Sequence, residues 1–191
     1  MALIDIYQQH TNDLQTALQA AAKWHAQINE VTLVVRAAFA AGNKVLVAGN
    51  GGSATLAEHL SDEMVGRYKS NRPPYPVIAL TADSAVLTCI GNDFGFENIF
   101  KRQVEALGKQ GDVFIGFSTS GNSANILLAA EQALAQGLTI VAFTGQTGKL
   151  KDIADYAIVS PATTTNRIQE MDLHAVHLLC EAFEPENITA L

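Results

Sequence analysis

Cysteine and charge are both scarce in this sequence. The 191 residues include two cysteines, Cys89 and Cys180, and no Cys-x-x-Cys pair. Two cysteines in a chain of this length do not make a disulfide framework, so a disulfide-rich scaffold is excluded. Hydrophobic residues make up 48% of the chain and charged residues 16%. This composition predicts a folded chain with a sizeable core and little disorder.

Positively charged residues are scarcer than negatively charged ones. Lys and Arg number 12 against 19 Asp and Glu, which gives a formal net charge of −7. Nucleic acids and anionic membranes attract basic surfaces, so we expect neither as a partner. Backbone amides could still hold a small anionic ligand.

Long apolar runs are also absent. No run approaches the roughly 18 residues of a transmembrane helix. The N-terminus MALIDIYQQH contains Asp5, and no Lys or Arg precedes Lys23, which is unlike a signal peptide. We therefore expect a soluble, cytoplasmic protein.

The order of patterns along the chain predicts one α/β domain. Residues 3–41 show helical spacing of apolar residues, and Gly42 is a typical helix stop. Helix-like stretches then separate most of five short β-branched runs, at 45–47, 77–80, 113–117, 139–143 and 156–159. Strands that alternate with helices form a parallel sheet. We predict a three-layer α/β/α sandwich with a five-stranded parallel sheet and a last helix over roughly 167–184. It is a single domain over 1–191, on which an N-terminal helical segment, 1–42, packs.

Small polar residues follow the predicted strands, where open parallel sheets bind ligands. The densest group is STSGNSAN, residues 118–125, after the third strand. Hydroxyls and the unpaired amides of a helix N-terminus suit a phosphate group. We therefore expect a phosphate cradle formed by Ser118, Thr119, Ser120 and Ser123. The alternative is that these residues only cap a helix and form turns.

The loop after the first strand, Gly49 to Ser53, gives a weaker signal. It fits the G-x-G-x-x-A form of the dinucleotide-binding fingerprint. The acidic residue that should follow about 20 positions later, at the end of the next strand, is missing. No Gly-Lys-Ser/Thr occurs in the chain. Dinucleotide binding is therefore disfavoured, and a P-loop is excluded.

Titratable side chains gather on two predicted helices. His59 and Glu63 are four residues apart, so they share one helix face, and the last helix carries Gln169, His174 and His177. A His/Glu pair with a distant His can bind zinc or act as acid and base, although a lone helical His is more often structural. Gln169 and His177 lie about 12 Å apart along a regular helix. If both belong to one kind of site, we expect a second chain to contribute.

Four stretches resemble the phosphoheptose isomerase family, whose members are single sugar-isomerase (SIS) domains. They are GNGGSATLAEHLSDEMVGRY (49–68), GNDFGFENIF (91–100), GFSTSGNSANI (116–126) and NRIQEMDLHAVH (166–177). The resemblance implies a flavodoxin-like fold and a homotetramer with active sites between subunits. It also implies isomerisation of the sugar phosphate sedoheptulose 7-phosphate to D-glycero-D-manno-heptose 7-phosphate, towards the heptose of bacterial lipopolysaccharide.

The resemblance also assigns roles by position. Zinc, one ion per active site, would be held by His59, Glu63, Gln169 and His177, and the base and acid would be Glu63 and His177. Substrate would be bound by Asn50, Gly51, Gly52, Ser53, Asn92, Asp93, Ser118, Thr119, Ser120, Ser123 and Gln169. Two positions depart from the family: Asp172 stands where members often have His, and Asn166 where some have Asp.

The implied reaction moves a proton between C1 and C2 through an enediol, which requires a base, an acid and stabilisation of an oxyanion. A carboxylate on zinc is a poorer base, so the metal either polarises the sugar oxygens or occupies the acid–base site in a resting form.

The SIS domain is also a binding module. A tetrameric protein that associates with the bacterial replication initiator resembles this chain but lacks equivalents of Glu63 and His177. We therefore expect an isomerase, with a scaffold or a sugar-phosphate sensor as the alternatives.

Overall fold

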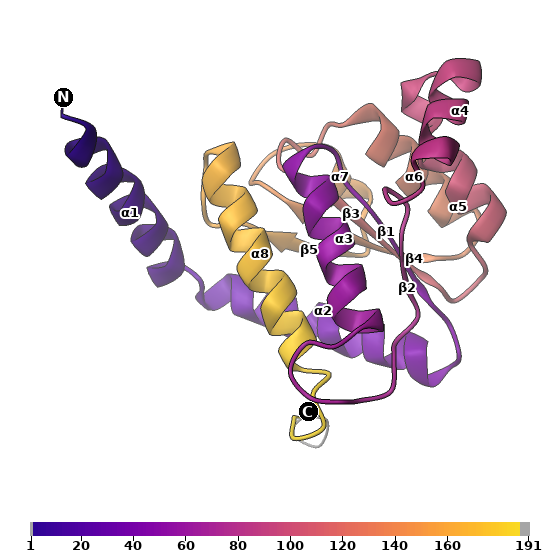
Figure 1. Cartoon of the computed structure of the whole chain (residues 1–191), viewed down its shortest axis with the longest axis horizontal. Helices are drawn as coiled ribbons and strands as arrows, with labels where there is room; N and C mark the ends of the chain where they lie inside the picture. Colours follow the sequence, from indigo (N-terminus) through magenta and orange to yellow (C-terminus); the bar gives the residue numbers. More distant parts are fainter. Residues whose placement is uncertain (1, 188–191) are drawn as a thin grey trace.

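A five-stranded parallel sheet forms the centre of the protein (Figure 1). The computed structural model describes residues 2–187. Neighbouring strands are parallel, in the order β2-β1-β3-β4-β5. This is the flavodoxin-type order, so the predicted fold class is confirmed. The strands are β1 (Val45–Ala48), β2 (Val77–Ala79), β3 (Val113–Ser118), β4 (Thr139–Thr144) and β5 (Tyr156–Val159).

Helices cover both faces of the sheet. Successive side chains of a strand point to opposite faces, so Val45 and Val47 enter one core while Leu46 and Ala48 enter the other. The first core is closed by α2 (Ala22–Ala40), α3 (Gly52–Val65) and α8 (Thr165–Glu181), with one end of α1 (Leu3–Gln19). The second is closed by α4 (Ser84–Phe94), α5 (Lys101–Leu107), α6 (Ala124–Ala135) and α7 (Leu150–Ile153), with a short 3₁₀ turn at Phe96–Asn98.

The topology fixes where the polar loops meet. The chain leaves β1 towards β2 on one side and returns through β3 on the other, so the strand order reverses between β1 and β3. Ligands of open α/β sheets bind at the carboxyl ends of the strands beside such a point. The loops 49–53 and 118–123 follow β1 and β3, and they therefore lie next to each other at that edge.

The two N-terminal helices differ in how far they pack. α2 buries Trp24, Ile28, Val31 and Val35 against the domain. Only Ala17 of α1 is buried, and Figure 1 shows the rest of α1 projecting from the body of the molecule. Leu3, Ile4 and Tyr7 are more than half exposed as a result. Packing of the whole 1–42 segment on its own domain stays a prediction, and α2 accounts for most of the contact within one chain.

Asp172 is the buried acid of α8. Its side chain is fully buried, and neither carboxylate oxygen has a hydrogen-bond partner among the described residues. Burial raises the pKa of Asp172 well above its ordinary value, because an unpaired carboxylate is poorly solvated inside a protein. Burial therefore favours the protonated form of this carboxyl group in the folded chain.

We expect Asp172→Asn to change how stability depends on pH. Above the ordinary Asp pKa near 4, the unfolded chain loses a proton that the folded chain keeps. The free energy of unfolding then falls as pH rises, by up to about 1.4 kcal/mol per pH unit, until the folded-state pKa is reached. Asn cannot ionise, so urea denaturation from about pH 5 to 8 should show a flatter profile for the variant. Exposed Asp152→Asn is the control, and parallel wild-type and Asp172→Asn profiles would refute the assignment.

No helix within residues 2–187 is both long enough and apolar enough to cross a membrane. Both cysteines are free thiols, with Cys89 exposed and Cys180 buried.

Candidate functional site

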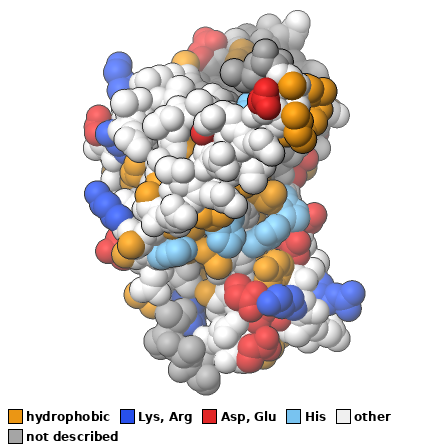
Figure 2. Space-filling model, turned by 90° about the vertical axis from the view of Figure 1, so that its left-hand side faces the viewer, with side chains coloured by type: hydrophobic (Ala, Val, Ile, Leu, Met, Phe, Trp, Pro, Cys, Tyr) orange, Lys and Arg blue, Asp and Glu red, His pale blue; other side chains and the backbone are white. Residues whose placement is uncertain are grey.

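Three titratable side chains converge between α3 and α8. His59 and Glu63 project from one face of α3, and His177 projects from α8. The Nε2 atoms of His59 and His177 are 2.9 Å apart, and His59 Nε2 is 3.6 Å from Glu63 Oε1. One ligand atom from each residue lies within 4.8 Å of the others. Figure 2 shows histidine side chains gathered side by side on one face of the molecule. The predicted grouping of His59, Glu63 and His177 is therefore present within a single chain.

The contacts of His59 bear on what this cluster can bind. Its Nδ1 lies 3.2 Å from Oδ1 of Asp62, on the side of the ring away from His177. Nε2 of His59, Nε2 of His177 and Oε1 of Glu63 lie close together, and each can present a lone pair to a proton or a cation. Two imidazoles and a carboxylate are a donor set that suits zinc, so the residues present fit such an ion.

Gln169 lies apart from the three-residue cluster. A Cβ atom on Gly52 would come within 2.6 Å of the Gln169 amide nitrogen, so the absence of a side chain at Gly52 makes room for Gln169. α8 thus contacts the start of α3 through Gln169 and the third turn of α3 through His177. Gln169 and His177 are about 12 Å apart along α8, so they lie apart within one chain. The assignment of Gln169 as a metal ligand stays a prediction that involves a second subunit.

The predicted phosphate loop follows β3 and turns tightly. The hydroxyl oxygens of Ser118 and Ser123 are 3.0 Å apart, and the Ser120 hydroxyl accepts a hydrogen bond from the backbone of Asn122. Gly121 adopts a φ of +66°, and a Cβ there would lie 2.7 Å from the carbonyl oxygen of Thr147. Only glycine fits this position without strain. The loop therefore brings Ser118 and Ser123 together, with Thr119 and Ser120 in the turn between them, before α6 begins.

A pair of asparagines joins the two loops. Asn50 Nδ2 donates to Asn125 Oδ1 at 2.9 Å, and Asn125 Nδ2 donates to Asn50 Oδ1 at 2.8 Å. Asn125 is 2% exposed, so the pair is a largely dry link between the start of α3 and the start of α6. Ser53 is also buried, whereas Gly51 and Gly52 are exposed beside it. The sequence argument did not assign Asn125, although it belongs to the polar stretch 118–125.

Asn92 and Asp93 lie elsewhere in the chain. They are exposed near the end of α4, which packs on the face of the sheet opposite to α3 and α8 (Figure 1). Asn92 Nδ2 donates to Asp93 Oδ1 at 2.7 Å. Within one chain they do not join His59, Glu63 and His177. Their substrate-binding role remains a prediction that needs a neighbouring subunit.

Arg72 fixes the end of α3 that carries Glu63. Its guanidinium donates to the carbonyl oxygens of Glu63 at 2.8 Å and Met64 at 2.9 Å. Its Nε lies 3.4 Å from Oε1 of Glu184, and both side chains are almost fully buried. Glu184 in turn accepts from the backbone of Lys69 and Ser70. The sequence argument missed this positioning pair, because its partners are 112 positions apart along the chain.

Comparisons with known proteins agree with this geometry. A protein-family model of the SIS domain matches residues 7–145. A phosphoheptose isomerase of Aquifex aeolicus is 50% identical over 159 residues, which cover 83% of this chain and 83% of that protein. One from Akkermansia muciniphila is 46% identical over 169 residues, which cover 88% and 89%. The solved structure of a phosphoheptose isomerase from Francisella tularensis superimposes with a TM-score of 0.91 at 34% identity, covering 95% of this chain and 97% of the other.

These similarities extend over most of each chain and are not confined to one motif. The residues matched by the family model include both loops at the carboxyl edge and α3. Sequence identity of this level over more than four fifths of each protein, together with the shared SIS fold, shows that the chain belongs to the phosphoheptose isomerase family.

Proposed function

We propose that this protein interconverts sedoheptulose 7-phosphate and D-glycero-D-manno-heptose 7-phosphate. The observation that carries the proposal is the juxtaposition of Glu63 and His177 within one chain of this family. They are the residues that the replication-initiator-associating relatives are expected to lack. Incubation of the protein with sedoheptulose 7-phosphate, followed by NMR, tests the proposal, since a scaffold would leave the sugar unchanged.

The residues can supply the proton chemistry of an aldose–ketose exchange. A carboxylate at Glu63 can remove a proton from one of the two reacting carbons, and the His177 imidazole can protonate the neighbouring oxygen. The phosphate lies at the other end of the substrate, where the hydroxyl groups of the loop after β3 can bind it. This loop lies beside the start of α3. Gly52 and His59 are about 10 Å apart along α3, so the helix connects a binding end to a reacting end.

Zinc is the metal that suits this cluster, and we propose that His59, Glu63 and His177 hold it. When bound, the ion would polarise sugar oxygens or occupy the acid–base residues in a resting form. Metal analysis of the purified protein distinguishes zinc from an empty site. Activity that rises on chelation would identify the resting form, and activity that is lost and restored by zinc would identify the polarising role.

We also propose a homotetramer in the cytoplasm, with active sites completed between subunits. Three features support shared sites: Gln169 lies apart from His177, Asn92 and Asp93 lie on the other face of the sheet, and α1 projects with exposed Leu3, Ile4 and Tyr7. A second subunit could cover such an apolar helix. Light scattering of active protein tests the assembly, and a fully active monomer would contradict it.

Replacing Ser120 with Ala should weaken substrate use without removing the catalytic pair. The variant loses a hydroxyl in the phosphate loop, so we expect KM to rise and kcat to fall less than KM rises. Binding energy from the phosphate also positions the reacting carbons, which is why kcat is affected at all. Steady-state kinetics measures both parameters. Sedoheptulose without its phosphate should be a very poor substrate, and equal turnover of the two sugars would overturn the phosphate-loop assignment.

A further inference from the structure

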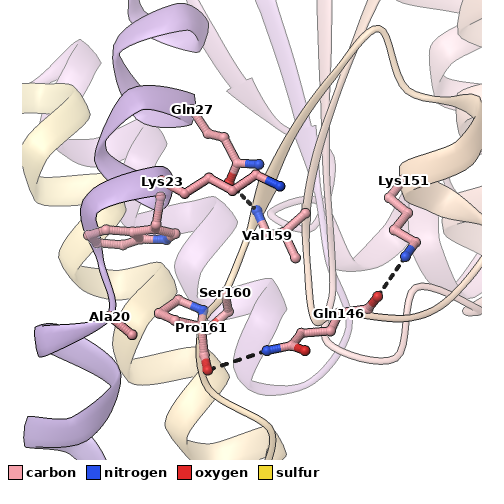
Figure 3. A pocket seen from close by; sticks show the side chains of 9 residues that line it. Ala20, Lys23, Gln27, Gln146, Lys151, Val159, Ser160 and Pro161 are labelled. Atoms are coloured by element: carbon pink, nitrogen blue, oxygen red, sulfur yellow. Dashed lines mark hydrogen bonds between the residues drawn. The ribbon is translucent and has the colours of Figure 1, made fainter.

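A pocket of about 460 Å³ lies between the start of α2 and the segments that follow β4 and β5. Figure 3 shows Lys23 and Gln27 of α2 on one side of it and Gln146 and Lys151 on the other. Val159, Ser160 and Pro161 also line it. No lining residue belongs to the candidate active site described above. The volume is within the range of small-molecule sites.

The polar groups of this pocket are mostly hydrogen-bond donors. Gln27 Oε1 accepts from the backbone N–H of Val159 at 3.0 Å, which leaves the Gln27 amide nitrogen for a ligand. Figure 3 shows that nitrogen and the Lys23 ammonium group pointing in the same direction, into the pocket. Lys151 Nζ donates one hydrogen bond, to the carbonyl oxygen of Gln146 at 2.6 Å, and keeps two further N–H groups.

The local charge is opposite to that of the whole chain. The protein carries a formal net charge of −7, yet no Asp or Glu within residues 2–187 lines this pocket, while two lysines do. Ammonium groups and amide N–H groups around one volume suit an anion, because charge-assisted hydrogen bonds to phosphate oxygens are the stronger kind.

Trp24 forms part of the wall of the same pocket. Its side chain is 1% exposed, so the indole contributes a rigid wall and not a hydrogen-bond donor for a ligand. The ring is also packed against the rings of His25 and His174, which hold it in place.

We propose that this pocket is a second anion site, which binds a small molecule bearing a phosphate group, separate from the phosphate loop after β3. A tetrahedral phosphate has enough acceptor oxygens to engage donors from α2 and from the segment after β4 together. Free phosphate and a phosphomonoester share this chemistry. Lys23 and Lys151 supply the charge, and the Gln27 amide nitrogen supplies a neutral donor.

Trp24 is the single tryptophan of the chain, so intrinsic fluorescence reports directly on this pocket. The protein is titrated with inorganic phosphate, with glucose 6-phosphate and with neutral glucose, at constant ionic strength kept by sodium chloride. We expect a saturable change with phosphate compounds and none with glucose. A response to glucose 6-phosphate at much lower concentration than to inorganic phosphate would identify a phosphomonoester as the ligand class, and equal responses would identify free phosphate.

Matched variants separate this site from others. Lys23→Gln combined with Lys151→Gln should raise the Kd at least about tenfold, since two charge-assisted contacts are lost. Lys109→Gln, an exposed lysine before the amino end of β3, should leave the Kd unchanged. Ser120→Ala should also keep the Trp24 response, because it alters only the phosphate loop. A response that does not saturate, or that persists at the same Kd in the double variant, would overturn the proposal.

Discussion

Replacing Glu63 with Gln is expected to lower kcat at least about 100-fold, the lower end of the effect of a general acid or base. Gln keeps the size of the side chain but cannot accept the substrate proton. The backbone of residue 63 stays held by Arg72, and the phosphate loop is untouched, so KM should change little. Steady-state kinetics with sedoheptulose 7-phosphate measures both values.

His177→Gln should have an effect of the same size, because the variant loses the acid. His174→Gln is the matched control: it removes a histidine from the same helix, one turn away, but His174 is exposed and belongs to no ligand group. Its kcat should be nearly that of the unmodified protein. Full activity in Glu63→Gln would show that another group is the base, even if the fold and the family stand.

Replacing Arg72 with Met should destabilise the fold by about 3–5 kcal/mol, the usual cost of removing one member of a buried ion pair. Glu184, with 0% of its side chain exposed, would lose its cationic partner. The carbonyl oxygens of Glu63 and Met64 would lose their donors as well. Urea denaturation measures the loss. Since Glu63 is tied to this pair, kcat should fall in the fraction that remains folded.

Lys69→Met provides the comparison for Arg72→Met. Lys69 Nζ lies 2.5 Å from Oε2 of Glu181, but its side chain is 54% exposed. Exposed ion pairs contribute about 0–1 kcal/mol. If both variants lost the same small free energy of unfolding, the buried pair would have no special structural role.

Most of the sheet could be predicted from the sequence because its strands are buried on both faces. Such strands appear as continuous apolar runs, and the runs at 113–117 and 139–143 differ from β3 and β4 only at one end. The projection of α1 could not be predicted in this way. Leu14, Leu18 and Ala21 repeat at helical spacing, but that spacing does not say whether the partner surface belongs to the same chain.

Part of the candidate site could likewise be predicted from the sequence, and part could not. His59 and Glu63 share a helix face, so local spacing was enough to pair them. The contact of His177 with His59 joins positions 118 residues apart, and only the resemblance to the family placed them together. The roles of Asp62 and Asn125 depend on where neighbouring side chains point. Sequence spacing alone does not carry that information.

Conversion of sedoheptulose 7-phosphate in D₂O tests the central claim most directly. The unmodified protein is incubated with the ketose, and NMR follows the appearance of the aldose. Proton exchange through an enediol predicts D-glycero-D-manno-heptose 7-phosphate with deuterium at C2. A ketose that remains unchanged in the presence of purified, folded protein would contradict the account.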